Sequence, residues 1–182
     1  MAYLLRTLNL VMILGMILVF LSAKNIYDFQ DYNHISLAIP YFIFTIFIQA
    51  FIMFYFIGVN RFTRNIYEII SSGKRLDELF EEIPRNYKDY EKKVSKFYFD
   101  SETFKRQTIP WTMIMLTLGT FAFLLGGAHD TDLVEIHVHS GVSYGFAAAS
   151  LIGFTKQWIY LGKAHLLLRK IKTLFMLEHN SM

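Results

Sequence analysis

The sequence predicts an all-α integral membrane protein: a bundle of four transmembrane helices with a cytoplasmic helical hairpin between the second and third. Hydrophobic residues make up 54% of the 182-residue chain, more than a soluble domain of this size would ordinarily hold. Four apolar runs each approach the ~20 residues that a helix needs to cross ~30 Å of hydrocarbon. No linker or repeat divides the chain, so we expect one membrane domain over residues 1–182. The runs cover residues 3–23, 35–59, 109–127 and 141–161.

The first two runs are interpreted as retained spans. Leu21 stands where a signal-peptidase site needs a small residue, and the first run is long for a signal peptide. Arg6 is expected to extend its charged end to the inner membrane surface. The second run has Gln49 as its one strongly polar side chain.

Basic residues predict the orientation. Residues 60–108 contain eleven of the 18 Lys and Arg residues, whereas the two short connections on the other side contain only Lys24. Because basic residues near span ends stay in the cytoplasm, we expect this segment and both termini to be cytoplasmic, in the inner membrane.

The segment 60–108 is expected to form the helical hairpin. The second helix continues to Ser72, where Gly73 ends it, and an amphipathic helix follows Pro84. The favoured interpretation is a hairpin that packs on itself and on the inner membrane surface. The alternative is a docking platform for a partner.

The third and fourth runs complete the spans. Pro110 and Trp111 are expected to open the third, because Pro suits a first helical turn and Trp suits the membrane interface. Residues 162–177 are expected to continue the fourth as a basic amphipathic helix near anionic headgroups. Five glycines are expected to lie at helix ends or where helices pack closely, namely those at 126, 127, 141, 145 and 153.

Composition also excludes several functions. The chain has no cysteine, which excludes an iron–sulfur cluster, thiolate metal sites and covalently attached haem. The spans contain almost no ionisable side chains, which argues against a lone pump, channel or transporter. The net charge of +3 is typical of cytoplasmic loops, and we expect no nucleic-acid partner.

The candidate site lies on the outer face, where histidines and carboxylates gather. Imidazole and carboxylate ligands suit copper, zinc or iron, and two opposed imidazoles, His34 and His139, suit haem b. If the connection is helical, Glu135 and not His137 shares a face with His139. The alternatives are a solvated connection and a quinone or small-molecule pocket. The candidate metal ligands are His34, His129, Asp130, His137 and His139.

A resemblance rests on several short stretches within residues 33–161. The chain resembles a loosely characterised group of bacterial four-span membrane proteins. The resemblance implies the four-span fold and draws attention to His34, but it implies no activity. Asn60, Phe62 and the long charged middle segment depart from it. The stretches are Phe54-Tyr55-Phe56-Ile57-Gly58 with Arg61, Pro110-Trp111, and Gly126-Gly127-Ala128 with Asp130-Thr131 and His139.

We therefore expect a small accessory, non-catalytic subunit of a larger inner-membrane complex, respiratory or oxidative in type. Its partners would be the lipid bilayer and other membrane subunits, and it would hold a metal or haem at the outer face if the histidines converge. No catalytic residue is predicted. The alternative is a self-contained membrane protein that binds haem b or copper and transfers electrons.

Overall fold

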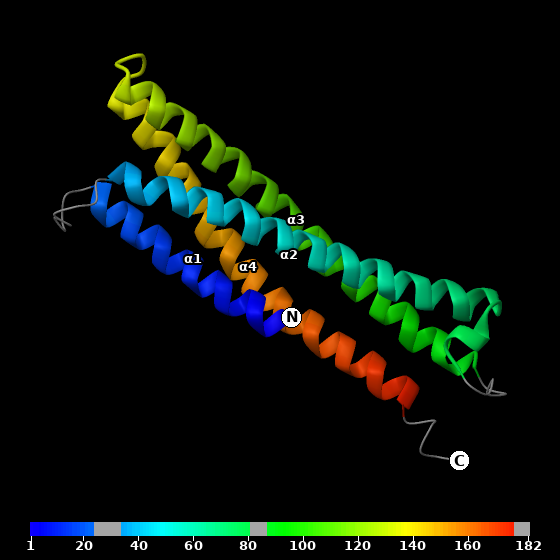
Figure 1. Cartoon of the computed structure of the whole chain (residues 1–182). Coiled ribbons are helices and arrows are strands. Elements are labelled where there is room, and N and C mark those ends of the chain that lie inside the picture. Colours follow the sequence, from blue (N-terminus) through cyan, green and yellow to red (C-terminus); the bar gives the residue numbers. More distant parts are fainter. Residues whose placement is uncertain (24–33, 81–86, 177–182) are drawn as a thin grey trace.

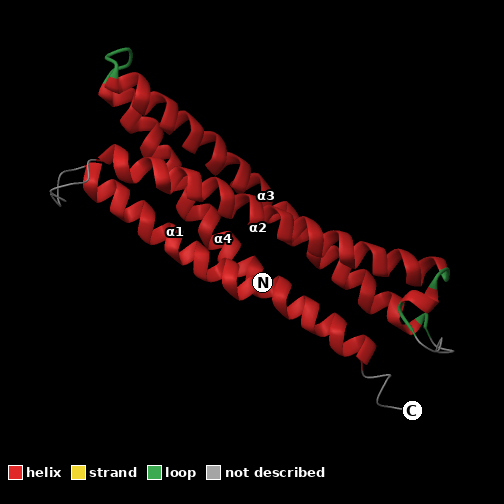
Figure 2. Cartoon of the chain, viewed as in Figure 1, coloured by secondary structure: helices red, strands yellow, loops and turns green. Residues whose placement is uncertain are grey.

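This computed structural model describes residues 1–23, 34–80 and 87–176, and the regular secondary structure in this part is all helical (Figure 2). The all-α prediction is confirmed there. Three of the helices in this part are long and apolar enough to cross a membrane, namely α1, α2 and α3. The elements are α1 (Ala2–Ala23), α2 (His34–Ser72), the 3-10 helix η1 (Leu76–Glu78), α3 (Asp89–Asp130) and α4 (Ile136–Met176).

The fourth helix lacks an apolar stretch as long as those of the other three. Its N-terminal half is rich in glycine, serine and alanine, and Lys156 and Gln157 follow directly, so α4 is not among the three helices with a span-like apolar stretch. It is nevertheless long: 41 residues extend about 60 Å at 1.5 Å per residue. Helices α2 and α3 are of similar length, with 39 and 42 residues.

The helices pack side by side in the cyclic order α1, α2, α3, α4, so that α1 contacts α2 and α4 but lies across the bundle from α3 (Figure 1). With only 22 residues, α1 covers about half the length of its neighbours. Two regions result. The apolar bundle contains α1 and the parts of α2, α3 and α4 beside it. The three-helix extension contains residues 60–72, 89–108 and 162–176 together with η1.

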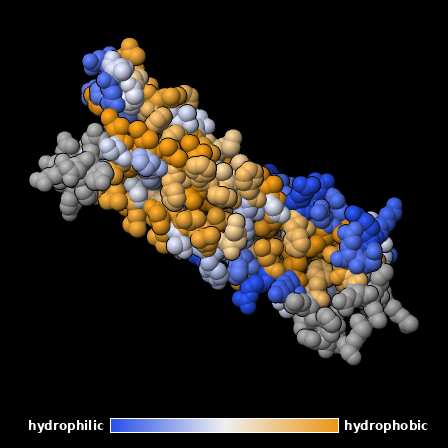
Figure 3. Space-filling view, in the orientation of Figure 1, coloured by the Kyte–Doolittle hydropathy of each residue, from blue (hydrophilic) through white to orange (hydrophobic). Residues whose placement is uncertain are grey.

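Surface hydropathy separates these regions. Apolar side chains cover the middle of the molecule, whereas hydrophilic ones gather at the α3–α4 tip and over the three-helix extension (Figure 3). The apolar bundle exposes large apolar residues such as Phe47, Phe54 and Leu124, which are 62%, 64% and 58% exposed. Such a surface is stable beside lipid and costly in water.

The three-helix extension has its own apolar core. Ile70 of α2, Val94 of α3 and Ile171 of α4 are buried together there. Phe175 packs against Phe80 and Tyr90 at the far end, with ring centroids 5.5 and 6.2 Å apart. The apolar stripe predicted for residues 162–177 therefore packs, as far as Phe175, against the other two helices of the extension, while its place near anionic headgroups stays a prediction.

The turn after α2 follows the sequence-based prediction. α2 ends at Ser72, and Gly73 has the left-handed φ of +64° that an L-residue rarely adopts. The Gly73 amide donates a hydrogen bond to the Ile69 carbonyl at 3.1 Å. Glycine therefore ends the helix and turns the chain toward η1.

Pro110 contradicts its prediction, because it lies inside α3 and does not begin a helix. A proline in a helix interior removes the backbone hydrogen bond to the carbonyl four residues earlier. The helix continues because both of its halves are packed, with Phe104 before the proline and Met115 after it buried in the core. Packing on both sides offsets a local backbone cost of about 3 kcal/mol.

The predicted close packing at glycines holds at two of the five positions. A Cβ on Gly153 would lie 2.6 Å from Met115 Sδ, and one on Gly126 would lie 3.1 Å from His139 Cε1. A Cβ on Gly127, Gly141 or Gly145 would have no neighbour within 4 Å. Gly153 thus lets α3 and α4 approach closely in the apolar bundle.

Candidate functional site

Three of the predicted site histidines lie at one end of the bundle, the end that the predicted orientation places outside, and each is on a different helix. His34 is the first residue of α2, His129 lies in the last turn of α3, and His139 lies in the first turn of α4. The connection between α3 and α4 is short, because α3 continues to Asp130 and α4 begins at Ile136. The helices, and not an extended loop, therefore position these side chains.

His139 lies against α3. Its ring is nearly parallel to that of His129, with the centroids 6.5 Å apart and the planes 9° from each other. The space for the ring comes from Gly126, where a side chain would meet it at 3.1 Å. The Nδ1 atom of His139 is buried and has no hydrogen-bond partner.

Burial lowers the pKa of the His139 imidazole, and the nearby positive charges of His34 and His129 lower it further. A hydrogen bond with the backbone of Ala122 and the charge of Asp130 oppose this shift without cancelling it. The ring is therefore neutral at pH 7 and keeps a lone pair that can accept a hydrogen bond or coordinate a metal.

The other two histidines have partners. His34 Nδ1 lies 3.4 Å from Ser22 Oγ, which connects the start of α2 to the end of α1. His129 Nδ1 lies 3.1 Å from the Val134 carbonyl oxygen, inside the α3–α4 connection. These contacts fix the ring orientations at the ends of two helices.

His137 does not join this group. It is exposed in the first turn of α4, two residues from His139, where helical geometry separates their side chains by about 200°. Across the described ranges, no three His, Asp or Glu residues lie close enough together to hold a metal ion. The carboxylates of the first connection, Asp28 and Asp31, lie outside the described residues. The metal and haem ligands therefore stay a prediction.

The sequence-based analysis missed a buried polar cluster in the apolar bundle. Gln157 Nε2 donates to Gln49 Oε1 at 2.6 Å, and it lies 2.9 Å from Thr112 Oγ1. All three side chains are 0–1% exposed, and they come from α4, α2 and α3. Asn9 of α1 also donates to the α4 backbone, at the Phe154 carbonyl oxygen (3.0 Å).

Gln49 was recognised in the sequence, but its partners were not. Gln157 follows Lys156 near the end of an apolar run, where it is indistinguishable from an interfacial residue. Because each amide needs a partner in a dry interior, a polar residue in one span is a signal to look for its counterpart in another.

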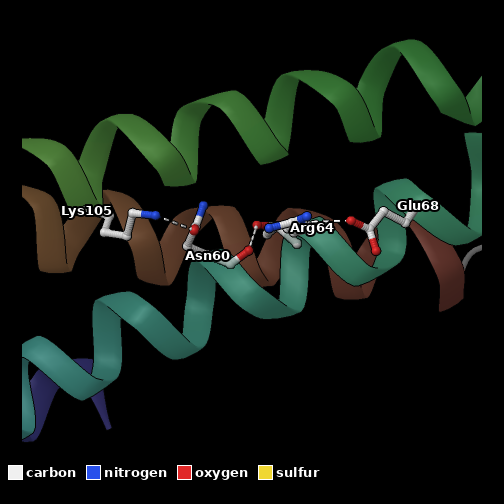
Figure 4. Close-up of polar contacts among 5 residues, drawn as sticks. Asn60, Arg64, Glu68 and Lys105 are labelled. Carbon is white, nitrogen blue, oxygen red and sulfur yellow. Dashed lines mark hydrogen bonds and ion pairs between the residues drawn. The ribbon is translucent and has the colours of Figure 1, made fainter.

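A second polar cluster lies where the apolar bundle meets the three-helix extension (Figure 4). Lys105 Nζ donates to Asn60 Oδ1 at 2.9 Å, and Asn60 Nδ2 donates to Ser101 Oγ at 3.1 Å. The Ser101 and Thr63 hydroxyl oxygens are 2.6 Å apart. One turn further along α2, Arg64 Nε donates to Glu68 Oε1 at 2.7 Å on the surface.

Two tryptophans at the same level hold cations over their rings. The Arg6 guanidinium lies 4.0 Å from the centre of the Trp158 ring. Lys156 Nζ donates to Gln107 Oε1 at 2.8 Å and lies 5.7 Å from the centre of the Trp111 ring. Tryptophan with Lys or Arg is typical of a membrane–water interface. These residues define a polar level opposite the histidines, called the inner polar level after the predicted orientation.

Fold and site together define a helical protein with span-like apolar helices, polar at both ends and hydrogen-bonded inside. Comparisons of the chain with protein-family models, curated proteins and solved structures found no match.

Proposed function

We propose that this chain is a small, non-catalytic subunit of a larger complex in the inner membrane, respiratory or oxidative in type. The observation that carries the proposal is the three-helix extension. Residues 89–108 of α3 continue about 30 Å past the apolar bundle, packed against α2 and α4. A chain that only had to fill a membrane would not need this rigid projection, whereas a chain that contacts soluble parts of its partners would.

The interior of the bundle supports a structural role. Gln49, Thr112 and Gln157 are hydrogen-bonded to one another and fully buried. Polar side chains paired in this way hold spans in register. Groups that handle a substrate would instead face a cavity or a solvent path.

Four spans are part of this proposal, with α4 as the fourth. From His139 to Lys156, α4 extends about 26 Å, close to the ~30 Å of the hydrocarbon layer. The same distance, about 26 Å, separates Arg6 from Ala23 in α1. Both helices thus connect the inner polar level to the outer end, where the histidines lie. The lower hydropathy of α4 is compatible with a helix that contacts both α1 and α3.

Cysteine labelling tests this topology, since the chain contains no cysteine of its own. Ser72 and Leu133 are both exposed, at opposite ends of the molecule. In intact cells an impermeant maleimide should label Leu133→Cys and leave Ser72→Cys unlabelled until the membrane is opened. Labelling of Ser72→Cys in intact cells would overturn the cytoplasmic placement of residues 60–108 and of the termini.

Purification from native membranes in a mild detergent tests the accessory role. We expect the tagged chain to migrate in a complex several times its own 21.4 kDa, with other membrane subunits in fixed ratio. A variant with Ile70→Asp, which places a charge in the core of the three-helix extension, should lose these subunits. Migration as a lone chain under conditions that preserve known complexes would reject the proposal.

A second candidate function is a membrane protein that binds haem b or copper and transfers electrons. The convergence of His34, His129 and His139 at one end of the bundle favours it. The absorption spectrum and the metal content of the native material distinguish the two candidates. A Soret band, or one metal per chain that is lost in His139→Ala, would support the second candidate.

A further inference from the structure

A groove on the outside of the three-helix extension brings apolar and basic side chains together. Its volume is about 380 Å³. One lining residue, Phe97, comes from α3, and the other five come from the last three turns of α4. The lining residues are Phe97, Leu166, Arg169, Lys170, Thr173 and Leu174.

The groove has an apolar floor and a basic rim. Leu166 is 55% exposed although it is an apolar residue in a charged region. Phe97 and Leu174 are half-buried beside it, whereas Arg169 and Lys170 are exposed. This arrangement suits a ligand that is apolar on one face and negatively charged along its edges.

The positive charge of the rim is not balanced within the described part of the chain. Helix α4 contains no Asp or Glu in its 41 residues. The ion pairs found among the described residues join Arg64 to Glu68 and Arg75 to Glu78, and both lie outside the groove. An approaching carboxylate therefore finds unpaired guanidinium and ammonium groups.

The position of the groove along α4 favours a protein over a lipid. Lys156 marks the inner polar level, and the groove extends from Leu166 to Leu174. These residues lie about 15 to 27 Å past Lys156 along the helix axis. The headgroup layer adds only about 5 to 8 Å on each side of the hydrocarbon. A lipid anchored in the bilayer does not reach that far.

We propose that this groove binds an acidic amphipathic helix from a partner subunit. The inference rests on the accessory role proposed above and names the chemistry of the contact. Apolar side chains one and two turns apart on the partner would lie against Leu166, Phe97 and Leu174. Carboxylates flanking them would pair with Arg169 and Lys170.

Photocrosslinking in native membranes tests the proposal. The full chain carries the crosslinking residue benzoylphenylalanine at Thr173, in the groove, or at Phe99, which is 57% exposed on α3 outside it. We expect Thr173 to give one protein adduct and Phe99 to give none at that mass. Mass spectrometry of the adduct should map the contact to a peptide with apolar residues at helical spacing and Asp or Glu beside them.

Charge reversal tests whether the rim selects this partner. Arg169→Glu with Lys170→Glu should reduce the Thr173 adduct at least about tenfold, the change that 1.4 kcal/mol of lost binding produces. Lys-for-carboxylate changes in the mapped partner peptide should restore it. The matched control, Arg61→Glu with Lys92→Glu, reverses two exposed charges outside the groove lining and should leave the adduct unchanged. Circular dichroism confirms that each variant is folded.

Several results would overturn the inference. These are an adduct to phospholipid, an adduct to a second copy of this chain, no adduct, a mapped peptide without acidic residues, or an adduct that survives charge reversal. If the chain still purifies in a larger complex, only the groove assignment fails. If the chain purifies alone, the accessory role fails as well, and the two failures are thereby distinguished.

Discussion

The apolar bundle has an apolar surface and buries hydrogen-bonded amides among its apolar core residues, whereas the three-helix extension has a more hydrophilic surface over an apolar core, with its buried polar side chains near the junction with the bundle. Gln49 and Gln157 are fully buried in the bundle, beneath exposed residues such as Phe54. In the extension, Ile70 and Ile171 are buried beneath a charged surface. Helices α2, α3 and α4 run through both regions, so each changes the character of its exposed surface partway along its length.

The difference has a physical cause. In water, apolar burial drives helices together at about 25 cal/mol per Å². Lipid tails are as apolar as leucine, so that force is weak between spans. Close packing and interhelical hydrogen bonds replace it. Apolar burial should therefore stabilise the three-helix extension most, and close packing with interhelical hydrogen bonds should stabilise the apolar bundle. Variants in each region should separate these two contributions.

The largest effect is expected in the core of the three-helix extension. Ile70 is 1% exposed, and Ile70→Ala should destabilise the protein by about 2–5 kcal/mol through lost burial and the cavity left behind. Thermal unfolding in detergent, followed by circular dichroism, measures it. Phe62→Ala is the control on the same helix, because Phe62 is 48% exposed and should have a much smaller effect. Equal losses would mean that the extension has no apolar core.

A smaller effect is expected where α3 and α4 approach in the apolar bundle. Gly153→Ala places a Cβ 2.6 Å from Met115 Sδ, and overpacking of this kind costs about 1–3 kcal/mol. Gly145→Ala gains the same helix propensity with open space around it, so the difference between the two variants isolates the contact. Gly153→Ala should unfold at a lower concentration of a denaturing detergent than Gly145→Ala does. Identical midpoints would show that the flexible Met115 side chain moves aside without a cost in stability.

The interaction energy between the two buried amides should be smaller. Removing one partner, as in Gln157→Leu, leaves the buried Gln49 amide with only the 3.3 Å hydrogen bond from Thr112 Oγ1 and costs about 1–3 kcal/mol. The double variant Gln49→Leu with Gln157→Leu should recover part of this loss. The coupling from the double-mutant cycle should be about 0.6 kcal/mol, and at most about 1.7. Strict additivity of the two single losses would mean that the amides do not interact.

The smallest effect concerns pH at the outer end. Folding lowers the pKa of His139 below its ordinary 6.5, so the unfolded chain takes up this proton at higher pH than the folded chain does. The stability that depends on neutral His139 is complete above about pH 6.5 and decreases as the pH falls toward the lowered pKa. His139→Gln should flatten the dependence of the melting temperature on pH between 7 and 5. Exposed His137→Gln should leave the wild-type slope, and a slope equally flat in both variants would contradict the assignment.

Much of the helical architecture could be predicted from local pattern. Apolar length predicted α1 almost to its ends, and Ser72 followed by Gly73 predicted where α2 stops. These are properties of a segment and its solvent, and they need no partner segment. Pro110 was misplaced because its preference for a first turn is a local one, which packing on both sides of α3 overrides.

The candidate site was only partly predictable. The sequence placed His34, His129 and His139 near one membrane face, but neither their separation nor the orientation of their rings follows from residue order. Asp130, His129 and His137 were assigned to a loop and lie on helices, which separates His137 from His139. That separation depends on the residue at which α4 begins. The short polar sequence before α4 does not determine this boundary.

The amino-acid sequence by itself determined that the chain is helical, that most of its helices are apolar over a membrane's thickness, and that its charges lie at the ends. These follow from periodicity and from the cost of transferring each side chain between water and hydrocarbon. Only the tertiary structure decided which polar residues meet. Gln49 and Gln157 are 108 positions apart, and their hydrogen bond exists only because α2 and α4 pack in one particular register. Contacts between distant segments depend on the packing of whole helices, and no single segment encodes them.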